Sequence, residues 1–259
     1  MRYHPRVIPL LLLEADRLVK TTKFRSPSYV GDPINAIKVF NEKYCDELIL
    51  LDIGSSKRNT PINFNLIEEC ASQCMMPLSY GGGIKTIEDA RTLFSIGVEK
   101  IVLQSSVCHD PSFTSALVDV FGSQSICVSL DIRKSRLGGY KLLNKVKGLR
   151  SSAWIKVANR FESLGAGEIL INYVDHDGTQ LGLNHDLIVQ ASSKLGLPLI
   201  AAGGTSSLND VQRGLSNGAS AIAVGSLFVH YGPHKAVLIS YPSESCLSSL
   251  GDSVQSSSH

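Results

Sequence analysis

The chain has 259 residues, 43% hydrophobic and 19% charged, and its 25 Lys and Arg residues against 23 Asp and Glu residues leave a net charge of +2. This balance argues against a strongly basic nucleic-acid-binding protein, and the apolar content is enough for a large core, which argues against disorder. The longest apolar runs, such as residues 7–13, are far shorter than the roughly 18 residues that span a bilayer. The N-terminus carries no signal-peptide pattern, so we expect a cytoplasmic protein with no membrane contact.

Eight short apolar runs alternate with amphipathic stretches, a pattern typical of βα units that close a parallel sheet. The runs lie in residues 6–12, 47–52, 77–80, 100–104, 125–131, 168–172, 198–202 and 221–224. Between them, Asp32-Pro33 and Asp110-Pro111 each place a capping carboxylate before a proline, and residues 86–89 match a capping box. Eight units in this length predict an α/β fold, a (β/α)8 barrel, with an open doubly wound sheet as the alternative.

An internal repeat favours the barrel over the open sheet. Shifting the chain by 121 residues aligns residues 47–50 with 168–171, Gly82-Gly83 with Gly203-Gly204, and Gln104-Ser105 with Gly225-Ser226. Residues 8–12 also nearly match residues 127–131. Because two (βα)4 halves can close on one another, we predict one (β/α)8 TIM barrel over residues 1–242, built from two half-barrels. The Ser-rich residues 243–259 are expected to form a flexible tail.

Six cysteines are present, and only Cys70 and Cys74 are closely spaced. Their helical spacing, with no second Cys or His pair to complete a tetrahedral site, predicts buried thiols and no metal site. We expect no disulfide and no cofactor.

Glycine pairs follow the third and seventh runs, where barrel loops build ligand sites. Glycine lets the backbone approach a ligand closely, and a helix that follows directs its N–H groups and dipole to the same place. The sequence therefore predicts two phosphate sites related by the repeat, although a single glycine pair is equally typical of an ordinary turn. The first glycine site comprises Gly82, Gly83, Gln104 and Ser105, and the second comprises Gly203, Gly204, Gly225 and Ser226. A phosphorylated ligand with two phosphates would span them across the barrel mouth.

Several segments together resemble the cyclase subunit of imidazole glycerol phosphate synthase, the HisF family. These segments are residues 6–9, 31–33, 46–48, 81–84, 121–124, 165–170 and 175–179, and the likeness extends to about residue 241. The resemblance implies that a glutaminase, HisH-like, docks at the N-terminal face of the barrel. Ammonia would then pass through the barrel, and a diphosphate ribonucleotide would be cyclised at the C-terminal face.

The family's ammonia entrance is a ring of four charges, which the resemblance maps onto Arg6, Glu47, Lys100 and Glu168. Charged strand starts also occur at barrel bottoms for stability alone. Two acids and two bases at the starts of strands one, two, four and six would pair around the axis, and unpaired buried charges are costly. We therefore favour the interpretation that these four residues form an ammonia gate over the interpretation that they serve stability alone.

The family's two catalytic aspartates, at the ends of strands one and five, are only half present. Asp131 matches the second, whereas Leu12 stands at the position of the first. An isobutyl group neither donates nor accepts a proton, so the resemblance predicts impaired acid–base chemistry. Glu14 and Asp16 are poor substitutes, because Glu14 shares the direction of Leu12 only if the strand continues and Asp16 falls in the loop.

One branch of the family, the AglZ/HisF-like acetamidino modification proteins of bacterial surface-glycan loci, shares residues 11–13, 20–24, 31–36 and especially 232–242. The leading prediction is therefore a synthase-like subunit that receives ammonia and supports acetamidino formation on a sugar, with a separate sugar amidotransferase as a further partner. The alternatives are imidazole glycerol phosphate synthase of histidine biosynthesis, a lyase, and a catalytically silent ammonia conduit or scaffold.

Loop residues over the mouth complete the predicted site. Lys20 reaches a substrate phosphate if its loop closes, although loop lysines are mostly solvated. Asp177, Gly178 and Thr179 match the family's substrate-contact loop, and Asp177 also suits a purely structural Asx turn. Tyr173 stands where the family has a small residue and is expected to narrow the mouth.

Overall fold

The structure is a computed structural model that describes residues 5–58, 60–232 and 234–256. Residues 1–4 of the predicted barrel domain, Pro233 and residues 257–259 of the predicted tail lie outside the described residues.

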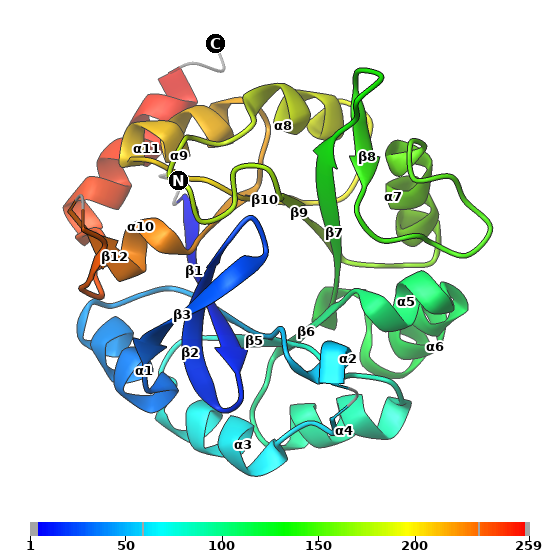
Figure 1. Cartoon of the computed structure of the whole chain (residues 1–259), viewed down its shortest axis with the longest axis horizontal. Helices are drawn as coiled ribbons and strands as arrows, with labels where there is room; N and C mark the ends of the chain where they lie inside the picture. The colour runs from blue at the N-terminus through cyan, green and yellow to red at the C-terminus, as the bar shows by residue number, and fades with distance from the viewer. Residues whose placement is uncertain (1–4, 59, 233, 257–259) are drawn as a thin grey trace.

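Eight parallel strands close into a barrel, as Figure 1 shows from one end. In spatial order the strands are β1 (Arg6–Glu14), β4 (Leu48–Asp52), β5 (Leu78–Gly81), β6 (Lys100–Leu103), β7 (Ile126–Lys134), β9 (Glu168–Tyr173), β10 (Leu199–Ala202) and β11 (Ala221–Val224). Pairing of β11 with β1, in which Arg6 lies beside Ala221, closes the circle. The predicted (β/α)8 barrel is confirmed, and each predicted run contains its strand to within a few residues.

Helices surround the barrel (Figure 1). The longer ones are α1 (Pro33–Glu42), α3 (Phe64–Gln73), α4 (Ile87–Ser95), α6 (Ser112–Phe121), α7 (Trp154–Ser163), α8 (His185–Ser192) and α9 (Leu208–Ser216). The shorter ones are α2 (Ser55–Arg58), α5 (Ser105–His109), α10 (Ser226–Val229) and the 3-10 turn η1 (Ser123–Ser125). Apolar side chains cover both faces of the strands. One buried cluster fills the layer between sheet and helices, and a smaller one, including Ile8, Ile49 and Leu170, fills the barrel interior.

Helix starts follow local capping chemistry. Asp32 accepts a hydrogen bond from the Asn35 amide before Pro33, and Thr86 forms a reciprocal capping box with Asp89, both as predicted. Helix α6 starts one residue later than Asp110-Pro111 suggests, because Asp110 instead accepts from the Ser112 amide and hydroxyl, while Pro111 occupies the N-cap position.

Two hairpins add strands that the sequence analysis did not anticipate. β2 (Arg17–Thr22) and β3 (Arg25–Gly31) extend antiparallel from β1 and project over the barrel opening, and β8 (Tyr140–Leu142) pairs with the end of β7 (Figure 1). A short hairpin of β12 (His230–Tyr231) and β13 (Ala236–Val237) follows α10.

The C-terminal segment differs from the flexible tail expected for residues 243–259. Helix α11 (Glu244–Ser256) packs beside α9, and its Leu247 and Leu250 are buried at 2% and 6% exposure. The Ser-rich composition concealed this apolar spacing of three residues, which places both leucines on one helix face. Among the described residues, no helix combines the length and apolar character needed to cross a membrane.

Candidate functional site

The four predicted gate residues meet at the N-terminal end of the barrel strands. Arg6 Nε and Nη2 donate to the two carboxylate oxygens of Glu47 at 2.6 and 2.8 Å, and Arg6 Nη1 donates to Glu168 Oε1 at 2.7 Å. Lys100 Nζ donates to Glu168 Oε2 at 2.5 Å. These residues, here called the charged ring, therefore form a chain in which Arg6 and Glu168 each serve two partners.

The charged ring is partly withdrawn from water, so its pairing decides its ionisation. Hydrogen bonding to Glu47 raises the pKa of Arg6 despite burial. Burial raises the pKa of Glu168, but hydrogen bonds and the charges of Arg6 and Lys100 outweigh it, so its pKa lies below the ordinary value. Both shifts favour the charged forms of Arg6 and Glu168 at neutral pH.

The opposite end of the barrel contains a cavity of about 420 Å³. It is lined by all four members of the first glycine site and by Leu12, Asp131, Asn172 and Asp177, among others. The volume suits a small ligand. Predicted residues from β1, β5, β6 and β7 thus converge on one chamber at the C-terminal strand ends, where barrel enzymes carry their sites.

The first glycine site requires a glycine at position 82, because the residue has a φ of +120° and the backbone of Asp52 lies close to it. A Cβ there would lie 2.3 Å from the Asp52 carbonyl oxygen. The helix that presents backbone amides to this site differs from the predicted one. Helix α4 begins only at Ile87 and its first turn is capped by Thr86, whereas α5, which follows Gln104, has no side-chain cap. The uncapped first turn of α5, directly after β6, therefore offers backbone amide donors at this site.

Asp131 is buried at 8% exposure, and its side chain accepts a hydrogen bond from the side-chain amide of Gln104. Burial raises its pKa to about 7, an effect that the Gln104 bond lowers and the Asp177 charge increases. A carboxyl group that titrates near neutral pH can both donate and accept a proton in a catalytic cycle.

Leu12 lines the same cavity as Asp131, in the position predicted for the missing carboxylate. Strand β1 continues to Glu14, which the sequence left open. Glu14 does not reach the cavity lining and instead lies 3.7 Å from Arg58 Nη1. Asp16 occupies the turn after β1 with a φ of +63°.

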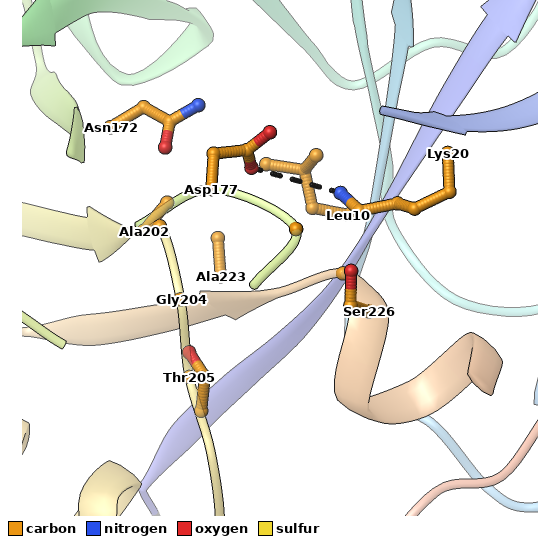
Figure 2. Close-up of a pocket in the computed structure, with 12 residues that line it drawn as sticks. Leu10, Lys20, Asn172, Asp177, Ala202, Gly204, Thr205, Ala223 and Ser226 are labelled. Carbon is orange, nitrogen blue, oxygen red and sulfur yellow. Dashed lines mark ion pairs between the residues drawn. The ribbon is translucent and has the colours of Figure 1, made fainter. Parts of the chain in front are cut away.

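The second glycine site lines a separate, smaller pocket (Figure 2). Gly203 and Gly204 have φ values of +101° and +94°, and a Cβ on Gly203 would lie 2.5 Å from the Tyr173 carbonyl oxygen. The hydroxyls of Thr205 and Ser226 line this pocket, are buried, and find no hydrogen-bond partner among the described residues. Buried hydroxyls without partners indicate a place for a polar ligand or water.

The β2–β3 hairpin covers the second glycine site. Lys20 is 6% exposed, and its Nζ lies 3.8 Å from Asp177 Oδ1, the ion pair drawn in Figure 2. The Lys23 amide donates to the Asp177 carbonyl at 2.8 Å. The solvated alternative for Lys20 is therefore wrong, and Asp177 contacts the lysine rather than only forming a turn.

Gly178 lines the same pocket, but Thr179 does not. The Thr179 hydroxyl donates to the His176 carbonyl at 2.6 Å and accepts from the Leu181 amide, which holds the turn together. Tyr173 does not narrow the mouth, because it points outward from β9 into the helix layer, where it packs against Tyr140 and His176. The alternation of side chains along β9 explains this placement.

Asn172 and Thr205 are among the polar lining residues that no sequence pattern predicted. Asn172 is the next-to-last residue of β9 and contributes to both pockets, with its Oδ1 buried and unpartnered among the described residues. Thr205 directly follows Gly204. The sequence signal for these two residues is a polar side chain near a strand end or beside a glycine pair, and the sequence prediction used it for neither. Within the described ranges, no three His, Cys, Asp or Glu side chains are placed to hold a metal ion.

Comparison with known proteins places this arrangement in a family. The model of the family described as "Histidine biosynthesis protein" matches residues 6–235. A Pseudomonas aeruginosa protein named "Putative imidazole glycerol phosphate synthase subunit hisF2" is 48% identical over 92% of this chain and 95% of its own length. Proteins of Leptospira borgpetersenii and Vibrio vulnificus, named as putative subunits HisF and hisF3 of the same synthase, are each 42% identical. The chain belongs to the histidine biosynthesis protein family and, within it, to the HisF proteins.

Proposed function

We propose that this HisF protein is the synthase subunit of imidazole glycerol phosphate synthase, which joins ammonia to a phosphorylated ribonucleotide at the barrel mouth. The observation that carries the proposal is the position of two sites at opposite ends of one barrel interior. The charged ring lies at the strand starts, and Asp131 and the two glycine sites lie at the strand ends. Ammonia would enter through the ring from a HisH-like glutaminase docked at the N-terminal face.

The residues of the mouth support three roles. The glycine sites would hold the two terminal phosphates of the ligand, where Ser226 and Thr205 offer free hydroxyls. Lys20, already inside the pocket, would neutralise phosphate charge. Asp131, whose pKa near 7 suits proton transfer, would act as general acid and base, with Asp177 as a further carboxylate of the cavity.

A second candidate is favoured by Leu12. Without a carboxylate at that position, the chain would bind its ligand and conduct ammonia while a separate amidotransferase forms an acetamidino group on a surface-glycan sugar. The sequence alone ranked this reading first. The names of the relatives support the synthase of histidine biosynthesis instead.

One assay separates the candidates. The purified chain is supplied with the family's diphosphate ribonucleotide and excess ammonium salt, which removes the need for a glutaminase. Formation of the imidazole product, abolished in Asp131→Asn, supports the first candidate. Binding of the ribonucleotide without product overturns it and leaves the second.

A further inference from the structure

The segment after the second glycine site carries a basic residue that the proposed function has not used. The β12–β13 hairpin follows α10 directly, with Lys235 between its two strands. Lys235 Nζ lies 3.4 Å from the Gly178 carbonyl oxygen. Gly178 lines the pocket of the second glycine site, so this ammonium group lies at the edge of that pocket.

The second glycine site already contains one cation, but that charge is compensated. Lys20 Nζ lies 2.5 Å from the position of a Cβ on Gly225 and pairs with Asp177. No ion pair joins Lys235 to a carboxylate in the part of the chain that the structure describes. Its side chain donates to the Gly178 carbonyl oxygen, and its backbone amide donates to the Gly232 carbonyl oxygen at 3.1 Å. The pocket edge therefore has one positive charge in excess.

The pKa of His230, the first residue of β12, responds to the same two positive charges. Burial lowers its pKa, and the charges of Lys235 and Lys20 lower it further, so both ammonium groups lie close enough to act on one imidazole. Its Nδ1 is buried without a partner among the described residues. The second glycine site itself offers the unpartnered hydroxyls of Thr205 and Ser226, which are 4% and 8% exposed, and its carboxylate, Asp177, is paired with Lys20.

We propose that Lys235 is a specificity-determining residue of the second glycine site, where its ammonium reaches from the β12–β13 hairpin to the terminal phosphate of the bound ligand. The inference rests on the proposed function, because it assumes that a phosphate occupies this site. The four-carbon stem of lysine allows Nζ to leave the Gly178 carbonyl for a stronger, charge-assisted bond to phosphate. The ligand class is an organic phosphate with a free terminal group, and the hairpin fixes which end of it enters.

Calorimetric titration of the full chain with ribose 5-phosphate tests this role apart from catalysis. Lys235→Met is expected to raise the dissociation constant about fivefold, the upper range for a solvent-accessible ion pair. Lys235→Arg should restore affinity because it restores the charge. Lys23→Met, in the exposed turn of the β2–β3 hairpin, serves as the matched control and should leave affinity unchanged.

A double-mutant cycle assigns the effect to one site. Combining Lys235→Met with Ser226→Ala should give less than the product of the two single effects, since both remove contacts to one phosphate. Combining it with Ser105→Ala, in the first glycine site, should give the full product. Unchanged affinity in Lys235→Met, or coupling to Ser105 in place of Ser226, would overturn the inference while the proposed function stands. Failure of the native chain to bind ribose 5-phosphate would overturn both.

Discussion

Arg6 and Glu168, which are 162 residues apart in the sequence, are joined by a 2.7 Å hydrogen bond between strands β1 and β9. Glu168 also pairs with Lys100, so one carboxylate holds two cations at the barrel floor. The ring is therefore a structural element of the closed barrel as well as a candidate entrance for ammonia.

Removing that carboxylate should destabilise the protein. Glu168→Gln leaves Arg6 with one partner and Lys100 with none from the ring, so we expect the free energy of unfolding to fall by about 2 kcal/mol at pH 7, reduced from fully buried pairs because Arg6 is partly exposed. Denaturant unfolding measures this. Glu88→Gln, which breaks the exposed pair with Arg91, is the control and should change little.

The same carboxylate should make the fold sensitive to acid. Because the pKa of Glu168 is lowered in the folded state, its stabilisation is complete above its ordinary pKa of 4.5 and is lost as the pH falls through the lowered value. The stability gap between the native chain and Glu168→Gln should therefore narrow in this acidic range. A gap that stays constant down to pH 3 would show that the ion pairs do not stabilise the barrel.

Asp131 should produce the opposite pH dependence. Its pKa rises from 3.8 to about 7 on folding, so the native chain loses stability as the pH increases between these values. Asp131→Asn lacks this loss, and its stability relative to the native chain should increase by about 2 to 4 kcal/mol from pH 4 to pH 8. Unfolding curves at several pH values test the shift. A difference independent of pH would place the Asp131 pKa near its ordinary value.

A carboxylate at position 12 should restore the acid–base pair that the family resemblance predicts. Leu12 and Asp131 line the same cavity, so Leu12→Asp is expected to raise ammonium-dependent turnover at least about tenfold. Leu12→Asn introduces a side chain of the same shape as aspartate that does not exchange a proton, so it should not increase turnover. If both variants behave alike while remaining folded, position 12 affects only the shape of the pocket.

The C-terminal helix should contribute to the stability of the barrel. Leu247 is buried where α11 meets α9, and truncating it in Leu247→Ala should cost about 2 to 4 kcal/mol of unfolding free energy. Cys246→Ser alters the exposed neighbouring position on the same helix and should be nearly neutral. Equal stability of the two variants would mean that α11 is not part of the cooperative fold.

The apolar runs predict a parallel sheet, because strands buried on both faces are continuously apolar, and the internal repeat favours its closure into a barrel. The β2–β3 hairpin does not follow from the apolar pattern, because β2 carries only two apolar residues and β3 is exposed along most of its length. The family resemblance, by contrast, predicts the charged ring as a set, because it maps the four charges onto Arg6, Glu47, Lys100 and Glu168.

The mouth was only partly predictable. The glycines were found from their pairing and repeat, yet their surroundings depend on contacts between distant segments. The sequence alone does not decide whether Lys20 lies in solvent or reaches a ligand, because only the folded hairpin places it beside Asp177. Tyr173 was placed at the mouth because a register of one residue decides whether a strand side chain faces the interior or the helices.

The most direct test of the account follows nitrogen itself. The purified native chain is incubated with ¹⁵N-ammonium and the diphosphate ribonucleotide, and the imidazole product is analysed by mass spectrometry. The account predicts ¹⁵N in the product at a turnover within the usual enzymatic range of about 1 to 10³ per second, lost in Asp131→Asn. Bound ribonucleotide with no labelled product would contradict it.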